Sequence, residues 1–416
     1  MSLPLKVLVA LVAGLALGLG AAGSHSGALT GIVSVLEPVG SLWVAAIRMT
    51  VIPLVVSSLI VGVGGAAHPG RVAKVGGRAL MLFVLLLSTA AVVAVLAGPP
   101  ILAGIHLDPA AVETLRASAT RAGGTALEGA RTLPTATQWI IDLVPVNPVK
   151  AASDGAMLPL IVFTLAFGIA LTRVREDRRS AVLAAADGVM EASRVLVRAV
   201  LVIAPIGVFA LAATVGAKLG AAAAGALATY VVLVVSITLA FSLLFLYPAA
   251  VVFGRVSLRT FARAAFPAQA VAFSSRSSLA ALPAMLEAGR ERLGLPVSFG
   301  AFYFPLAVTL FRCGAAIGQV TGALFVAKLY GVDLGAGQLA AITLTTVVTT
   351  LSVPGIPGGS IIMIVPVLLA AGVPAEGVGL LLGVDTIPDM FRTTANVTGD
   401  MTAAVILARH GGATPT

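Results

Sequence analysis

The chain has 416 residues, of which 59% are hydrophobic and only 10% are charged, and its mean hydropathy is +1.07. This composition excludes an ordinary soluble domain and indicates a polytopic membrane protein. The formal net charge of +9 could suggest nucleic-acid binding, but the basic residues cluster in short loops between apolar runs, so no nucleic-acid partner is expected. A single cysteine, Cys313, excludes an internal disulfide and a cysteine-based metal site.

Six apolar segments long enough to cross a membrane come first in the chain. They are Pro4–Ala22, Val39–Ala67, Arg78–Ile105, Thr137–Arg173, Ala181–Gly216 and Ala221–Phe253. We interpret the first as a span and not as a cleaved signal peptide, because its length suits a full crossing. The loops after the second, fourth and sixth segments are rich in basic residues. This pattern places them, and both chain termini, on the cytoplasmic side of a bacterial-type plasma (inner) membrane.

The pattern changes after residue 253. Phe261–Glu287 is interrupted by a serine-rich run at 274–278 and by Pro283, and Leu339–Ala371 is interrupted by a Ser/Pro/Gly run at 352–360. No arm is long enough to cross, so we predict two re-entrant helical hairpins, although proline and glycine could merely kink two ordinary spans. Each is followed by a long apolar segment, Leu295–Tyr330 or Gly372–Ala408. Interrupted segments repeated in this way are typical of an inverted-repeat transporter.

The last of these segments carries charges that are costly inside a membrane. If Gly372–Ala408 is one helix, a single face holds Asp385, Asp389, Arg392, Asn396 and Asp400. An ionised side chain near the middle of a spanning helix costs roughly 2.5–3.5 kcal/mol, so such residues face the protein interior and usually mark a pathway. The stripe therefore predicts a buried site for a substrate or an ion.

The run DMFRTTANVTGD, from Asp389 to Asp400, resembles the last helix of the dicarboxylate/amino acid:cation symporters, the glutamate transporter family. Further segments resemble this family, in family order: Ile47–Leu54, Asp142–Pro148, Ala204–Phe209, Arg276–Ser278 followed by Leu282 and Pro283, and Gly355–Gly358. The resemblance implies an all-α polytopic membrane protein with eight transmembrane helices, two re-entrant hairpins and inverted repeats. It also implies a homotrimer in which a transport domain moves like an elevator against a scaffold.

The same resemblance divides the chain into alternating parts. Residues 1–72 would form scaffold helices 1 and 2, and 73–135 would form transport-domain helix 3 with an external loop. Residues 136–220 would form scaffold helices 4 and 5. The remainder, 221–416, would complete the transport domain with helix 6, the first hairpin, helix 7, the second hairpin and helix 8.

The resemblance also implies roles for individual residues. Arg392 should take the side-chain carboxylate of an acidic substrate and Asp389 its α-amino group, which suits a guanidinium fork and a buried carboxylate. The other expected substrate-binding residues are Thr393, Asn396, Ser278, Ile356, Gly358 and Ser360. A purely internal salt bridge between Arg392 and Asp389 is the structural alternative.

The chain departs from the family where its members carry an Asn-Met-Asp-Gly-Thr signature, because Phe311–Ala315 stands there instead. Oxygen ligands for sodium are missing from this run, while Asn396 and Asp400 resemble ligands of a residual sodium site. Arg312 adds a fixed positive charge, and we hypothesise that it replaces part of the cation site by pairing with Asp400. The alternative is that it snorkels to water or joins a structural pair.

The charges of the expected core balance without sodium. Arg276, Arg312 and Arg392 stand against Asp385, Asp389 and Asp400. Sodium coupling is therefore expected to be weakened or lost. A proton could be the coupling ion instead, through a buried carboxylate, because no histidine lies within an apolar segment. Beyond a coupling ion, no cofactor is expected.

These observations predict a secondary transporter that moves an acidic amino acid, such as aspartate or glutamate, by an elevator mechanism. The alternatives are a dicarboxylate or neutral amino acid symporter of the same fold, or a sodium-independent or proton-coupled carrier. An intramembrane protease is not expected, since Asp385 and Asp389 lie one turn apart beside Arg392 and would be neutralised. The expected partners are a small-molecule substrate, membrane lipids and two further copies of the chain.

Overall fold

The computed structural model of the chain describes residues 3–24, 27–64, 69–104, 138, 141–222, 226–351 and 359–410. In these ranges the chain is all-helical and contains no β-strand, which confirms the expected all-α class for this part of the protein. Helices suit such apolar segments because every backbone hydrogen bond is made within the segment itself.

The first half of the chain contains seven described helices. They are α1 (Leu3–Ser24), α2 (Gly27–Gly64), α3 (Pro69–Ala103), α6 (Pro148–Ser153), α7 (Met157–Leu171), α8 (Glu176–Val202) and α9 (Ala204–Ala222). Four continuous stretches of the described residues are long and apolar enough to cross a membrane, and the first two lie here, at Gly27–Gly64 and Val75–Ala103. The other two follow in the second half.

The second half begins with a helix that runs through a π-helical turn and ends in two helices that carry the polar stripe. Its elements are α10 (Ala226–Phe241), the π-helix Ser242–Leu246, α11 (Tyr247–Val252), α12 (Leu258–Ser275), α13 (Ser278–Leu293), α14 (Val297–Leu310), α15 (Cys313–Tyr330), α16 (Ala336–Thr350), α17 (Gly359–Ile362), α18 (Ile364–Ala370), a 3₁₀ turn (Ala375–Gly377), α19 (Val378–Val384) and α20 (Thr386–His410). The remaining two apolar stretches are Ala228–Val252 and Val297–Tyr330.

Two expected spans prove not to be single helices. Thr137–Arg173 contains α6 and the 15-residue α7, because Asn147 caps α6, Pro148 begins it, and Gly155, at φ +67°, follows its end. Ala181–Gly216 is divided at Ile203, where α8 and α9 bend by 55°. If that bent pair is one span, the described residues hold five candidate spans.

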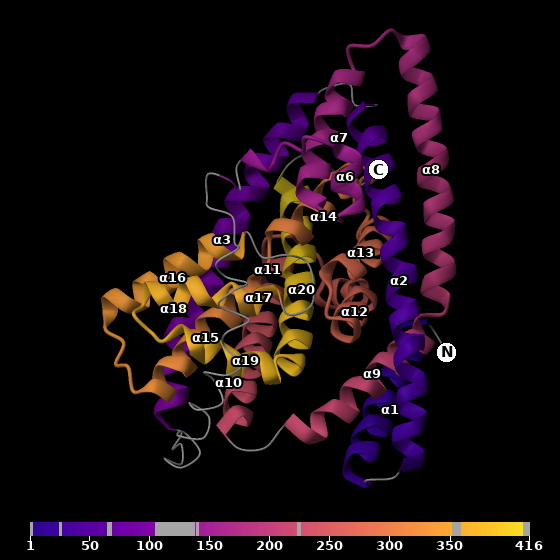
Figure 1. Cartoon of the computed structure of the whole chain (residues 1–416). Helices are drawn as coiled ribbons and strands as arrows, with labels where there is room; N and C mark the ends of the chain where they lie inside the picture. Colours follow the sequence, from indigo (N-terminus) through magenta and orange to yellow (C-terminus); the bar gives the residue numbers. More distant parts are fainter. Residues whose placement is uncertain are drawn as a thin grey trace.

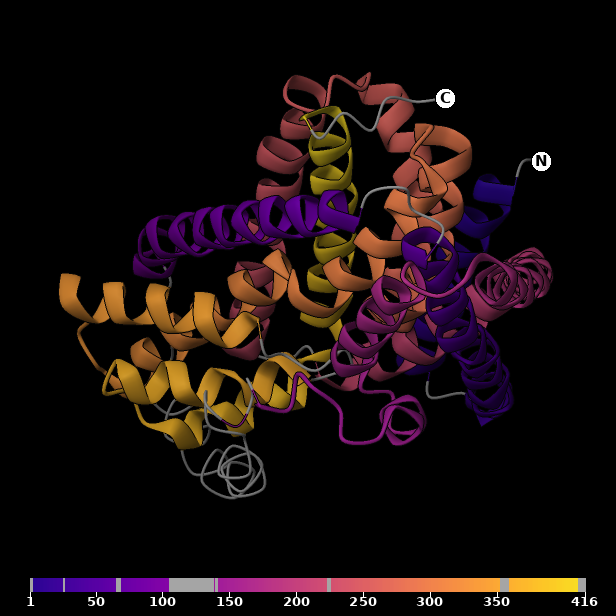
Figure 2. The same cartoon turned by 90° about the horizontal axis from the view of Figure 1, so that it is seen from above.

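The helices pack in two groups that meet along α2, α13 and α14. In the first group α1 packs on α9, and α2 packs on α7, α8 and α9; in the second, α3 packs on α10, α15 and α16. Figures 1 and 2 show α1, α2, α8 and α9 on one side of the molecule, α3, α15 and α16 on the other, and α20 between them.

Glycines allow the closest of these contacts. A Cβ at Gly18 of α1 would lie 2.1 Å from the carbonyl oxygen of Ala213 in α9, and one at Gly14 would lie 2.4 Å from that of Phe209. Small residues four apart let helix backbones approach in this way in membrane proteins. A larger side chain at either position would separate α1 from α9.

The first interrupted segment forms a helical hairpin. Helices α12 and α13 pack against each other and are joined by Arg276, in the left-handed conformation at φ 54°, and Ser277, whose hydroxyl accepts a hydrogen bond from Ala280 N at 3.3 Å. The interruption expected at 274–278 is thus present, but Pro283 lies inside α13 and does not end it. In the second interrupted segment α16 ends at Thr350, and residues 352–358 lie outside the described part.

Gly372–Ala408 is not one continuous helix. The segment is a 3₁₀ turn followed by α19 and α20, which meet at Asp385. Asp389 N still donates to Asp385 O at 2.8 Å, so the helical spacing continues across the junction. The polar stripe therefore survives the break, and Asp385 lies at the junction.

Candidate functional site

The centre of the polar stripe is an ion cluster around Arg392, which is 1% exposed. Its Nη2 donates to Asp385 Oδ1 at 2.5 Å and to Asp389 Oδ1 at 3.2 Å. Both aspartates are buried, so the three charges share a site that has little contact with solvent. Removing one partner from such a buried pair typically costs about 3–5 kcal/mol, which makes the cluster a strong constraint on this end of α20.

The other two nitrogens of Arg392, Nε and Nη1, donate to no described residue. The side chain lies flat on α15, where a Cβ at Gly318 would be 2.3 Å from Arg392 Cδ and 2.8 Å from Nη1. Only glycine leaves this space. Buried N–H donors without an acceptor are costly, so this arrangement suits an incoming anionic group.

Asn396, one turn along α20, holds the start of α15 in place. Its Oδ1 accepts hydrogen bonds from Gly314 N at 2.8 Å and Ala315 N at 3.2 Å. These donors are among the first-turn N–H groups that a helix cannot satisfy by itself, and Arg312 at the N-cap position provides no side-chain cap. Asn396 thus caps α15 from another helix, and its Nδ2 remains as the group that could face a substrate.

Asp400 lies deepest in the stripe. It is 0% exposed, and neither carboxylate oxygen accepts a hydrogen bond from a described residue. Arg312, which breaks the helix between α14 and α15, donates through Nη2 to Val308 O at 2.8 Å and is the charged group that acts on Asp400 through space. No direct hydrogen bond joins Arg312 to the Asp400 carboxylate, so the pairing expected between these residues stays a prediction.

The residues around Asp400 do not fit a sodium ion. Asn396 Oδ1 is engaged by α15, Cys313 offers sulfur and donates to Ala395 O at 3.3 Å, and Arg312 brings a positive charge. The described residues hold no group of three or more His, Cys, Asp or Glu side chains that could bind a metal. A hard cation needs several oxygen ligands, and here one carboxylate is the main oxygen donor left.

The remaining predicted site residues lie around this stripe or outside the described part. Thr393 is buried on α20, Ser278 is buried at the first turn of α13, and Ser360 is buried in α17. Helices α12 and α13 both pack on α20, and Phe273 meets Phe391 edge-on at 5.2 Å. Ile356 and Gly358 lie outside the described residues. Arg276 is partly exposed at the tip of the first hairpin.

The sequence alone did not single out three buried residues of α10 and α15, two of which, Gly318 and Tyr230, lie by Arg392. Gly318 and Gln319 are on α15, and Tyr230 is on α10. Tyr230 OH and Gln319 Nε2 have no hydrogen-bond partner among the described residues. A tyrosine or a glutamine within an apolar span is only a weak indication of a binding site, because its polar atoms usually find hydrogen-bond partners in neighbouring residues.

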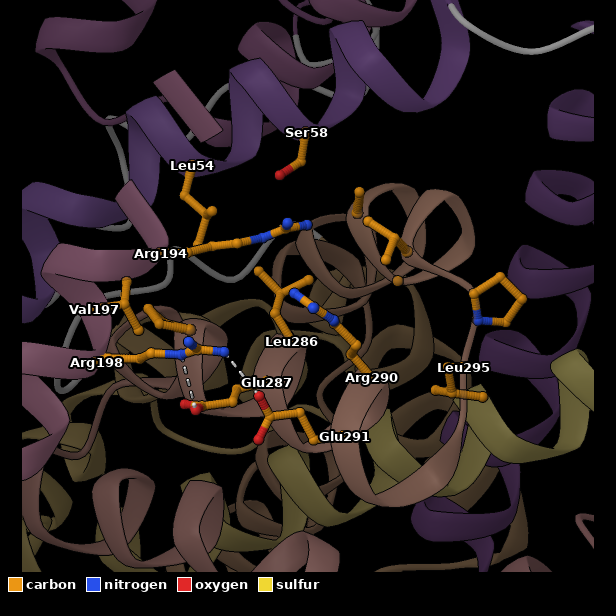
Figure 3. Close-up of a pocket in the computed structure, with 15 residues that line it drawn as sticks. Leu54, Ser58, Arg194, Val197, Arg198, Leu286, Glu287, Arg290, Glu291 and Leu295 are labelled. Carbon is orange, nitrogen blue, oxygen red and sulfur yellow. Dashed lines mark hydrogen bonds and ion pairs between the residues drawn. The ribbon is translucent and has the colours of Figure 1, made fainter. Parts of the chain in front are cut away.

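A separate cleft lies where the two helix groups meet, between α2, α8 and α13 (Figure 3). Arg198 of α8 pairs there with Glu291 of α13 at 3.0 Å and with Glu287 at 3.8 Å. Arg194 points into the same cleft from α8. The cleft does not include the Arg392 cluster, so we treat it as part of the boundary between the groups and not as the substrate site.

Comparison with known proteins agrees with this architecture. The model of the sodium:dicarboxylate symporter family matches residues 3–410. A proton/glutamate-aspartate symporter of Escherichia coli (strain K12) is 31% identical, covering 91% of this chain and 86% of its own. A proton/sodium-glutamate symport protein of Bacillus subtilis (strain 168) is 33% identical with the same coverage, and a C4-dicarboxylate transport protein of Rhodospirillum rubrum is 27% identical over 98% of this chain and 88% of its own. With its apolar helices and a family match from end to end, this chain is an integral membrane protein that belongs to the sodium:dicarboxylate symporter family.

Proposed function

We propose that this protein is a secondary active transporter for an acidic amino acid such as aspartate or glutamate. The observation that carries the proposal is the buried guanidinium of Arg392, of which Nε and Nη1 donate to no described residue. A guanidinium holds a carboxylate well because its planar fork offers several N–H donors. Two of the three relatives support this assignment, because they are named for glutamate or for glutamate and aspartate, while the third is named for C4-dicarboxylates.

In this proposal Arg392 binds the side-chain carboxylate of the substrate, and Asp389 binds its α-amino group. The α-carboxylate is held by Asn396 Nδ2 and by the first turn of α13, whose N-terminus attracts anions. Thr393 and Ser278 line the site, and the second hairpin tip closes over it through Ile356, Gly358 and Ser360. Asp385 stays on Arg392 and fixes its orientation.

The charge of the cluster favours an amino acid over a plain dicarboxylate. Two carboxylates, Asp385 and Asp389, pair with the single guanidinium of Arg392, so its positive charge is already shared when the substrate binds. Aspartate brings one further negative charge together with an ammonium that can pair with Asp389, whereas succinate brings two negative charges and no ammonium. At low effective dielectric that difference disfavours succinate.

We further propose that coupling to sodium is weakened or lost. The support is Arg312, a fixed cation near the buried Asp400 carboxylate, together with a donor set that lacks the oxygens sodium requires. Asp400 is then neutralised by the chain itself. A proton is the remaining candidate for the coupling ion, and the name of the E. coli relative includes one.

Transport in this proposal follows an elevator motion, with both termini on the cytoplasmic side and three copies in the assembly. The helix group of α1, α2, α7, α8 and α9 would be the scaffold, and the group that contains α12–α15 and α20 would move. The boundary between the groups includes exposed ion pairs between Arg198 and the glutamates of α13, which are worth at most about 1 kcal/mol each. Such contacts can break and re-form during a cycle.

A binding screen and an uptake assay test the substrate and the coupling ion. Aspartate and glutamate should raise the Tm of the purified protein more than succinate does, and Arg392→Lys should abolish the effect, because lysine cannot form the bidentate fork. Stabilisation by succinate but not by aspartate would contradict the role of Asp389. In proteoliposomes, labelled aspartate uptake should respond to a pH gradient and little to a sodium gradient; steep sodium dependence would refute the role given to Arg312.

A cross-linking experiment tests the motion. Cysteines at Arg198 and Glu291 joined by a bifunctional maleimide should block uptake while aspartate binding persists, and the single Arg198→Cys variant treated in the same way should retain uptake. Cys313 is buried and should not react. Full uptake by the cross-linked protein would contradict movement at this boundary.

A further inference from the structure

Tyr230 of α10 is fully buried, yet its hydroxyl has no hydrogen-bond partner among the described residues. Its ring packs against Phe325 with the ring centroids 5.4 Å apart. A buried hydroxyl that loses water without gaining a partner costs about 1–3 kcal/mol. Buried hydroxyls in native structures nearly always have a partner, so this one calls for an explanation.

The hydroxyl lies beside the Arg392 cluster. Tyr230 OH is 3.8 Å from the position of a Cβ at Gly322, and Arg392 Nη1 is 2.8 Å from the position of a Cβ at Gly318. These two glycines are four residues apart, on one face of α15 and about 6 Å apart along its axis. The phenol and the guanidinium therefore occupy adjacent turns of the same helix face.

Two apolar side chains lie over Gly322 together with the hydroxyl. The Cδ1 atoms of Ile364 and Leu381 share the space over Gly322 with it. The charged groups that act on Tyr230 through space are Arg392, Asp385 and Asp389. The hydroxyl therefore lies within electrostatic reach of the ion cluster.

A carboxylate can accept hydrogen bonds from both groups at once, because it has two oxygens. One hydrogen bond from a guanidinium to a carboxylate spans about 2.7–2.9 Å, and one from a hydroxyl to a carboxylate about 2.5–2.7 Å. A carboxylate bound between the two donors would bridge adjacent turns of α15, while Asp385 remains on Arg392 Nη2. Its oxygens would then accept from Arg392 and from Tyr230 together.

We propose that Tyr230 is a specificity-determining residue whose hydroxyl donates a hydrogen bond to the side-chain carboxylate of the bound substrate, alongside Arg392. This inference rests on the proposed function, because it assumes that Arg392 binds that carboxylate. The residue would select substrates with an acceptor at this distance from Arg392. In the ligand-free protein the hydroxyl would have no partner, so its hydrogen bond would form only when the substrate binds.

The test is Tyr230→Phe in the full-length protein, with Tyr247→Phe as the matched control. Tyr247 OH accepts a hydrogen bond from Gln269 Nε2 at 3.0 Å and has no part in the Arg392 cluster. Calorimetry should show that Y230F raises the Kd for aspartate and glutamate about tenfold or more, the size expected for a hydrogen bond to a charged group, and that Y247F stays within about twofold. The ligand-free Tm of Y230F should be unchanged or higher, because the lost hydroxyl had no partner.

Two results would overturn the inference. One is a Kd for Y230F within about twofold of the parent protein. The other is a ligand-free Tm several degrees below that of the parent with the Kd unchanged, since the hydroxyl would then have a structural partner. Suppose that the parent protein binds aspartate, that R392K does not, and that Y230F binds it as the parent does. The role of Tyr230 is then wrong, and the proposed function still stands. If the parent binds no acidic ligand, the proposed function fails with it.

Discussion

Gly318→Ala should separate substrate binding from folding. The added Cβ would lie 2.3 Å from Arg392 Cδ, 2.8 Å from Nη1 and 3.2 Å from Nε. Carbon atoms in contact are normally about 3.5–4.0 Å apart, so the arginine side chain has to retreat by at least about 1.2 Å. Its backbone cannot follow, because α20 is packed against α12, α14 and α15. The guanidinium should therefore leave the position in which Nη1 and Nε face a ligand.

The expected stability change is small because two effects oppose each other. Alanine in place of glycine inside a helix contributes about 1 kcal/mol of stabilisation, and overpacking costs about 1–3 kcal/mol. The free energy of unfolding should fall by no more than about 2 kcal/mol. Losing one charge-assisted hydrogen bond to the substrate costs about 1.5–3 kcal/mol, so the Kd for aspartate should rise about ten- to hundredfold.

The same face of α15 supplies two controls. At Gly322 an added Cβ meets the ends of Ile364 and Leu381 at 2.8 and 3.0 Å, which can rotate away, and Tyr230 OH only at 3.8 Å, so Gly322→Ala should raise the Kd for aspartate less than Gly318→Ala does. At Gly314 it meets the backbone oxygen of Arg392 at 2.1 Å, so Gly314→Ala should be poorly folded. Calorimetry measures the Kd of each variant for aspartate, and thermal melting measures its Tm. Normal aspartate affinity in G318A, with a normal Tm, would refute the assignment of Arg392 to the substrate.

Three further predictions concern the charges. Asp385→Asn should lower the ligand-free Tm, since it removes the negative charge that pairs with Arg392 at 2.5 Å; an unchanged Tm would contradict the ion cluster. The double variant Arg312→Met, Cys313→Asp should bind aspartate more tightly as sodium is added. Calorimetry at several sodium concentrations would compare the Kd for aspartate of this variant with that of the parent. Arg198→Ala should lower the free energy of unfolding by less than about 1 kcal/mol, because this pair is exposed, yet change the uptake rate; an unaltered rate would argue against movement at the cleft.

The breaks in the helices were predictable where their causes are local. The turn at Arg276 and Ser277 follows from a serine-rich run whose second helix is capped by a serine hydroxyl. The division of Thr137–Arg173 was missed, although Asn147 and Pro148 are a start signal for a helix. A hydropathy window pools such residues with their apolar neighbours, so a long apolar run was interpreted as one span.

The partners of the site residues were less predictable, because they come from distant parts of the chain. The helical spacing placed Asp389 and Arg392 on one face, but Asp385 makes the shorter contact because α19 and α20 meet there. Asn396 caps a helix that begins more than eighty residues earlier. Nothing in the local sequence indicates that its oxygen is engaged in this way, or that Gly318 accommodates the side chain of Arg392.

The cap made by Asn396 also connects the two charged centres of the protein. Its oxygen fixes the start of α15 at Gly314 and Ala315, directly after Arg312, and a Cβ at Gly314 would meet the backbone of Arg392. A substrate that accepts a hydrogen bond from Asn396 Nδ2 would therefore contact the same side chain whose oxygen holds the start of α15. The position of that helix start determines how Arg312 lies relative to Asp400. Residues that contact the same side chain usually show coupled free energies. We therefore expect the free energy of substrate binding to be coupled to the electrostatic effect of Arg312 on Asp400, with no mobile cation needed between them.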